Sequence, residues 1–144
     1  MIDELAKYEK LNPPNLEAKE RLKHDLLSEF PRATAWLAEY EGIPVGYCIT
    51  LFTYSSFLAL PTLFIEDIFV LEDYRGKGIG KELYKFCMML ALNEGCGRME
   101  WVVLDWNKIA IDFYKRHGAE QISQWIPFRI NKEQMLESLN RDFK

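Results

Sequence analysis

Apolar residues recur along the chain with two different periods, and each period predicts a different kind of element. Helical spacing predicts one helix over residues 2–10 and a second that Asn15 can cap and that continues through Leu16 and Leu27 until Phe30-Pro31 closes it. The spacing then becomes that of strands separated by turns, in residues 33–40, 43–54 and 62–71. The N-terminal half therefore predicts two helices followed by a meander of strands.

The C-terminal half alternates between the two periods. A helix containing Leu83 follows a glycine-rich loop and ends near Gly95, and a strand is predicted over residues 99–104. Asn107 can cap a further helix that ends at Gly118, and residues 119–130 predict one or two strands interrupted by Pro127. A capping box, Asn131 with Gln134, opens the last helix. We expect a single mixed α/β domain over residues 1–144.

Charge and cysteine usage exclude several classes of protein. The 22 acidic residues exceed the 18 basic ones, for a net charge of −4, which argues against nucleic-acid binding. No apolar run is long enough to span a bilayer, so no membrane partner is expected. Cys48, Cys87 and Cys96 lack C-x-x-C spacing and the chain has two histidines, so we expect no disulfide framework, no metal site and a cytoplasmic, reducing setting.

A glycine-rich loop between a strand and a helix has the pattern of an anion site. It reads Arg75-Gly76-Lys77-Gly78-Ile79-Gly80 and is followed by Lys81. A P-loop is excluded, because the glycines are one residue too close and Glu82 replaces the hydroxyl residue that binds Mg²⁺. A dinucleotide fingerprint needs G-x-G-x-x-G at the first turn of a parallel sheet, whereas this loop is G-x-G-x-G. A plain glycine-rich connection is the remaining alternative.

An arginine followed by G-x-G-I-G after an acidic and apolar strand resembles the loop of the GNAT acetyltransferases. Further similarity to their diamine branch, the spermidine/spermine and thialysine acetyltransferases, lies in residues 4–9, 52–54, 63–70, 73–80, 106–107 and 113–119. The resemblance implies a GNAT fold, a central twisted mixed sheet flanked by helices, whose usual first strand is missing from this sequence. It also implies acetyl-CoA as cosubstrate without a metal, a small-molecule amine as acceptor, and a homodimer.

The reaction that the resemblance implies needs a base and an acid. An alkyl amine with a pKa of about 10.4 is mostly protonated at neutral pH, and Glu66 is the family's position for the carboxylate that removes the proton through water. Glu66 lies among apolar residues, where burial would raise its pKa; a structural pair with an arginine is the alternative. Tyr114 is the position of the general acid that protonates the departing thiolate, although a tyrosine on a helix is often only a core residue.

Binding roles also follow from the resemblance. Besides Arg75 to Lys81, the implied cofactor residues are the backbone of Ile68, Phe69 and Val70, together with Asn107 and Ala110; the implied substrate residues are Tyr8, Glu9, Glu66, Asp67 and Trp101.

The sequence departs from the polyamine-acetylating relatives at two places. Ser55-Ser56 follows Tyr54 where they carry an acid, and Ser123-Gln124 precedes Trp125 where they carry paired acids. A long polycation needs several carboxylates, so we expect a small diamine or an amino-acid side-chain amine as acceptor. The alternatives are a non-catalytic acyl-CoA-binding module and a GNAT enzyme for a protein or another amine. Apolar Trp125, Phe128 and Phe143 could form a dimer surface or pack internally.

Overall fold

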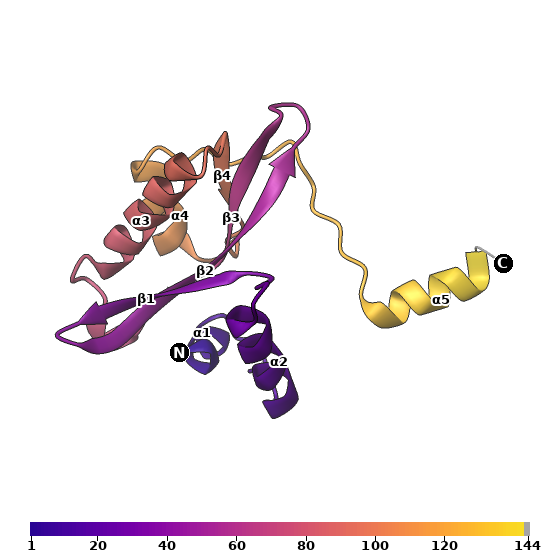
Figure 1. The fold of residues 1–144 in the computed structure, drawn as a ribbon, viewed down its shortest axis with the longest axis horizontal. Helices are drawn as coiled ribbons and strands as arrows, with labels where there is room; N and C mark the ends of the chain where they lie inside the picture. The colour runs from indigo at the N-terminus through magenta and orange to yellow at the C-terminus, as the bar shows by residue number, and fades with distance from the viewer. Residues whose placement is uncertain (143–144) are drawn as a thin grey trace. The chain divides into compact units, whose positions relative to one another are not determined.

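The computed structural model, which describes residues 1–142, falls into two compact units, Met1–Leu104 and Asp105–Lys144 (Figure 1). The elements of the first unit are α1 (Ile2–Tyr8), α2 (Leu16–Leu27), β1 (Thr34–Tyr40), β2 (Ile43–Ser55), β3 (Leu60–Val70), the short 3-10 turn η1 (Glu72–Tyr74), α3 (Ile79–Asn93) and β4 (Arg98–Trp101). The second unit contains α4 (Lys108–Arg116) and α5 (Lys132–Asp142). No helix among the described residues is long and apolar enough to cross a bilayer.

The first unit is built on a mixed sheet in the order β1-β2-β3-β4. The three strands of the meander pair antiparallel, and β4 joins β3 in parallel after the crossover through α3. The helices α1, α2 and α3 of this unit flank the sheet, so the predicted fold class, a mixed sheet with helices on its sides, is confirmed.

The two faces of β2 are covered by different helices, because successive side chains of a strand point to opposite sides. Tyr47 and Ile49 form one buried cluster with Leu5 of α1 and Phe69 of β3. On the other face the buried thiols of Cys48 and Cys87 lie 3.8 Å apart, which brings α3 against the strand. Figure 1 shows α3 on one side of the sheet and α1 with α2 on the other.

A β-bulge interrupts the pairing of β2 with β3. Ile49 pairs with Asp67 and Thr50 pairs with Ile65, so Glu66 is an extra residue in β3. The parallel pairing of β3 with β4 stops at the same place, since its last pair is Ile65 with Trp101. From Glu66 to Val70, the second edge of β3 therefore pairs with no strand of the described chain.

The predicted helix caps are confirmed. The Asn15 side chain accepts a hydrogen bond of 2.8 Å from the Ala18 amide, and Asn131 and Gln134 bond each other's backbone amides at 2.9 Å. Each cap satisfies amides that have no partner within their helix. The remaining boundaries agree within a few residues, except that the predicted strand over residues 99–104 already ends at Trp101.

The prediction of strands within residues 119–130 is wrong. These residues form no strand, although Ile126, Phe128 and Ile130 alternate as in one; their side chains are exposed by 75 %, 93 % and 54 %. A strand needs a neighbour to satisfy its backbone, and Pro127 also removes a donor. The apolar spacing of residues 119–130 therefore shows that these residues suit a strand, but it does not show whether a neighbouring strand is present to pair with them. Phe143, the third residue of the predicted dimer surface, lies outside the described residues.

Candidate functional site

The glycine loop has the backbone geometry that an anion site requires. Gly76 and Gly78 adopt φ values of +76° and +84°, in the left-handed region that favours glycine. A Cβ atom at either position would meet nothing within 4 Å, so the requirement is conformational and not steric. Gly78 is the N-cap of α3 and offers no side chain to cap it, which leaves the first-turn amides of α3 to an external acceptor.

The basic side chains of the loop are arranged in different ways. Arg75 donates a hydrogen bond of 3.0 Å from Nε to the Val70 carbonyl, and its guanidinium lies over aromatic rings. The ammonium of Lys77 lies 5.1 Å from the ring centre of Tyr40 and 4.8 Å from that of Tyr74. Lys81 is exposed on the first turn of α3. The loop thus presents positive charge around uncapped amides, an arrangement suited to a phosphate or diphosphate.

Three carboxylates gather where α1 meets the bulge of β3. Glu9, Glu66 and Asp67, the acidic cluster, make no ion pair with any residue of the described chain. Glu9 is the C-cap residue of α1, and the bulge places Glu66 and Asp67 together opposite Ile49. Like charges so close and without a cation favour a positively charged ligand.

Asp67 is the most perturbed group of the acidic cluster. Burial, followed by the charges of Glu66 and Glu9, raises the pKa of its carboxyl to about 6, and a hydrogen bond from Tyr47 opposes the rise. The Tyr47 hydroxyl donates that bond at 3.5 Å. Burial also raises the pKa of Glu9 above its ordinary value. A nearby ammonium group would reverse these effects, because it favours the ionised carboxylates.

Two predicted substrate residues differ from expectation. Burial of Glu66 is not observed: the bulge turns its side chain outward, where it is exposed, and Asp67 is the half-buried carboxylate. Trp101 packs edge-on against Tyr84 of α3, with ring centres 5.5 Å apart. Tyr8 lies beside the cluster, packed against the core of Leu5, Tyr47, Ile49 and Phe69.

The backbone of Ile68, Phe69 and Val70 lies on the part of β3 whose second edge pairs with no described strand. An extended ligand could add to this edge as a strand does, through backbone N–H and C=O groups. The edge runs from the acidic cluster to the glycine loop. The first unit therefore brings together the predicted anion site, the predicted strand edge and the carboxylates.

The other predicted residues belong to the second unit. Asn107 caps α4 by accepting a hydrogen bond of 3.2 Å from the Ala110 amide, as its spacing predicts. Tyr114 is half-buried on the same helix, with its ring centre 5.4 Å from that of Phe113. The roles of Asn107, Ala110 and Tyr114 toward the loop and the carboxylates of the first unit stay predictions.

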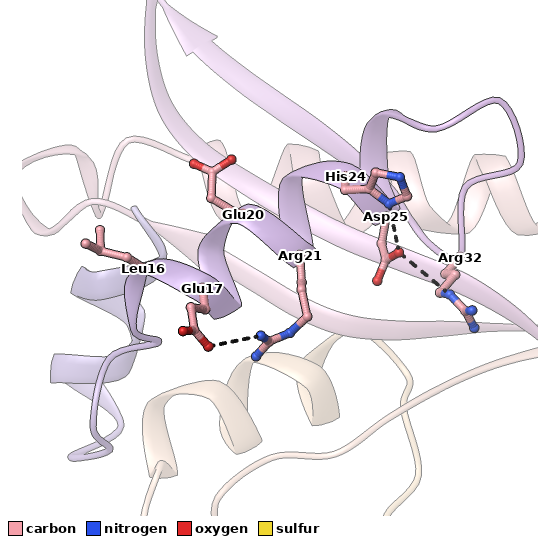
Figure 2. A pocket seen from close by; sticks show the side chains of 7 residues that line it. All are labelled: Leu16, Glu17, Glu20, Arg21, His24, Asp25 and Arg32. Atoms are coloured by element: carbon pink, nitrogen blue, oxygen red, sulfur yellow. Dashed lines mark hydrogen bonds and ion pairs between the residues drawn. The ribbon is translucent and has the colours of Figure 1, made fainter.

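Two pockets lie away from the acidic cluster. The larger, about 920 Å³, lies along α2, and its charged side chains largely neutralise one another, as Figure 2 shows for the pairs Glu17–Arg21 and Asp25–Arg32 at 3.8 and 3.7 Å. The smaller, about 620 Å³, lies between β1 and the start of α3 and is lined by Trp36, Lys77 and Phe86 among others. No group of His, Cys, Asp and Glu suited to a metal ion occurs in residues 1–142.

Sequence reasoning missed Tyr47. Its hydroxyl reaches Asp67 across the β2–β3 pair, and its side chain is only 5 % exposed. Two adjacent acids in an otherwise apolar strand were the available signal for the bulge. No comparable signal marks Tyr47, because its role depends on the register of the two strands.

Comparisons with known proteins agree with one another. Residues 4–119 match the model of the Acetyltransferase (GNAT) family. The chain is 37 % identical over 152 residues to the mouse protein named thialysine N-epsilon-acetyltransferase, covering 98 % of this chain and 89 % of that protein. It is 38 % identical over 122 residues to L-ornithine N5-acetyltransferase NATA1 of Arabidopsis thaliana, covering 82 % and 54 %.

Solved structures are similar in fold. An integron cassette protein from the mobile metagenome of V. cholerae superposes with a TM-score of 0.82 at 24 % identity, covering 98 % of this chain and 88 % of that one. The aminoglycoside N-acetyltransferase AAC(6')-Iy, solved in complex with CoA, superposes with a TM-score of 0.62 at 23 % identity, covering 81 % and 92 %.

Proposed function

The chain belongs to the acetyltransferase (GNAT) family and is an acetyl-CoA-dependent enzyme that acetylates an amine, and on this premise we propose that its acceptor is a small amine: a diamine, a short polyamine or an amino-acid side chain. The observation that supports this acceptor most is the acidic cluster, which has no cation of its own in the described chain. Relatives named for thialysine and L-ornithine point to the same class of amine.

The donor is held by the loop and by β3 in this proposal. The amides of Gly78 to Gly80 and the charges of Arg75, Lys77 and Lys81 bind the diphosphate of acetyl-CoA, while the backbone of residues 68–70 pairs with its pantetheine arm. Asn107, the N-cap of α4, and Ala110 in its first turn also bind the cofactor in this proposal. Bound acetyl-CoA supplies the thioester that the amine attacks.

The carboxylates hold and deprotonate the acceptor. Asp67 and Glu9 bind an ammonium group, which repays part of the cost of keeping two charges half-buried. Glu66, exposed on the bulge, removes a proton from the attacking amine through water. Tyr114 returns a proton to the thiolate. Tyr8 lines the acceptor side, on the face of the sheet that α1 covers.

The test is a steady-state panel of amines with acetyl-CoA, in which the released thiol is measured. We expect thialysine, L-ornithine and putrescine to give a higher kcat/KM than spermine, because the acidic cluster is short. Spermine as the best substrate would refute the acceptor class, and no acetylation of any amine would favour a non-catalytic acyl-CoA-binding module.

The acid is tested separately. Tyr114→Phe should lower kcat by about 10²-fold or more and leave the affinity for CoA unchanged, since a general acid acts in the transition state. Unchanged turnover would remove Tyr114 from the mechanism. His117, whose ring nitrogen lies 2.8 Å from the Phe113 carbonyl on the same helix, offers a control position outside the proposed chemistry.

A homodimer is part of the proposal. Trp125 and Phe128 in residues 119–130 are exposed by 77 % and 93 %, and side chains of this size favour burial in an interface. Light scattering coupled to size exclusion should give twice the 17.0 kDa mass of the chain, and a Trp125→Ser/Phe128→Ser variant should give the monomer mass.

A further inference from the structure

Arg75 connects the glycine loop to the first helix of the molecule. Its guanidinium carbon lies 4.7 Å from the ring centre of Tyr8 in α1 and 5.4 Å from that of Phe69 in β3. Its Nε donates to the Val70 carbonyl at 3.0 Å. A guanidinium within about 6 Å of a ring face is attracted by it, so Arg75 holds the end of α1 against the end of β3.

These contacts use only part of the arginine. A guanidinium has five N–H donors, and the bond to Val70 uses the one on Nε. Arg75 is exposed and makes no ion pair within the described chain. An anion can therefore bind the Nη edge while the ring contacts and the Val70 bond stay in place.

The other end of the contact leads to the acidic cluster. Tyr8 is the last residue of α1, and the next residue, Glu9, is its C-cap. Tyr8 packs against the cluster of Leu5, Tyr47, Ile49 and Phe69, and the hydroxyl of Tyr47 in that cluster donates to Asp67. The charge of Glu9 contributes to the raised pKa of the Asp67 carboxyl. The end of α1 that Arg75 contacts is therefore the end that carries Glu9.

We propose that the stack of Arg75 on Tyr8 couples the two substrates: an anionic cofactor on the loop fixes Arg75, and Arg75 fixes the end of α1 that carries Glu9 to the acceptor. This rests on the function proposed above. Ordering Arg75 through its Nη edge removes side-chain freedom that the stack would otherwise have to restrict, so the second ligand binds to a more ordered site. Arg75 acts on the amine as a positioning residue.

The size of the coupling follows from the contact. An exposed cation–π contact corresponds to a factor of about two to five in an equilibrium constant. Coupling between two binding sites is reciprocal. The cofactor should therefore tighten amine binding by about two- to fivefold, and the amine should tighten cofactor binding by the same factor.

Calorimetry with CoA, which has no acetyl group to transfer, and thialysine measures this factor directly. In the wild type the Kd of thialysine should fall about two- to fivefold when CoA is saturating. Tyr8→Phe keeps the ring and should keep the factor. Tyr8→Leu keeps apolar volume but loses the ring, and should bring the factor to about one; CoA alone should still bind, more weakly by about that same two- to fivefold factor at most.

Amide hydrogen exchange gives a second readout that needs no amine. CoA should slow exchange in α1 of the wild type and of Tyr8→Phe, but not in Tyr8→Leu or in Arg75→Lys at saturating CoA. Full coupling in Tyr8→Leu, or no effect of CoA on α1 in the wild type, would overturn the proposal. Acetyl transfer with no coupling would overturn this inference alone, whereas a wild type that neither binds CoA nor transfers acetyl groups would overturn the proposed function with it.

Discussion

Replacing Asp67 by asparagine should stabilise the free protein above pH 6. The folded structure raises the pKa of the Asp67 carboxyl from 3.8 to about 6, mainly by burial and then through the charges of Glu66 and Glu9. A group whose pKa is raised by folding adds stability that is complete below its unfolded pKa and is lost as the pH rises through its folded pKa. The wild type should therefore lose stability between about pH 4 and pH 6, and Asp67→Asn should not.

The magnitude can be worked from the same values. A rise of the pKa from 3.8 to about 6 corresponds to about 3 kcal/mol of unfolding free energy. Because the side chain is only half-buried, screening by water reduces this to about 1 to 2 kcal/mol. The amide oxygen of the variant can still accept the Tyr47 hydrogen bond at every pH, so the change with pH isolates the charge.

Urea unfolding followed by tryptophan fluorescence between pH 4 and pH 8 measures the difference between variant and wild type. The difference should grow by about 1 to 2 kcal/mol from pH 4 to pH 6 and then stay level. Glu66→Gln is the matched comparison: it keeps the Asp67 carboxyl and removes one neighbouring charge, so the loss of stability with rising pH should become smaller without disappearing. A difference that is the same at every pH would refute the argument that the cluster holds an unsatisfied charge.

Three further outcomes follow from local geometry. Gly78→Ala, which forces a side chain to φ +84°, should cost about 1 to 2 kcal/mol and weaken CoA binding, as urea unfolding and calorimetry would show; wild-type values for both would contradict this. Asn15→Ala should lower the unfolding free energy by about 1 kcal/mol in urea unfolding, because the Ala18 amide loses its acceptor; an unchanged unfolding free energy would contradict this. In thiol titration the half-buried Cys96 should react first, and Cys48 and Cys87 only in urea; simultaneous reaction of all three would mean that the core opens readily.

Local features of the fold were predictable because they depend on neighbouring residues. Asn15 and the Asn131–Gln134 box cap their helices as their spacing predicts, since a cap bonds amides two or three residues away. The hairpin of β1 and β2 was predictable because two apolar segments flank residues Glu41 and Gly42, which form a tight turn between them. The strands expected in residues 119–130 were not predictable in this way, because a strand also needs a neighbouring strand, and the local sequence does not show whether one is present.

The candidate site was predictable as a set of residues, but not in its arrangement. Two adjacent acids in an apolar strand, Glu66 and Asp67, indicated the carboxylates of the candidate site. Which of the two is buried depends on the register of β3 with Ile49 in β2. The partner of Asp67, Tyr47, is 20 positions away in sequence. The stack of Arg75 on Tyr8 joins the glycine loop to a helix much earlier in the chain. The basic residues of the loop predicted a bound anion, but nothing in the sequence indicated this contact.

The bulge also determines how the hairpin responds to changes in its length. Removing Glu66 would set Ile65 and Asp67 next to each other while Thr50 and Ile49 kept them as partners, so every other pair of the hairpin would stay as it is. Removing Ile65 or Asp67 instead would also give a regular ladder, but it would put Glu66 in the vacated position opposite Thr50 or Ile49. Without Glu66 the hairpin would be a regular ladder in which β3 is one residue shorter. The residue that interrupts the ladder is thus also the proposed base.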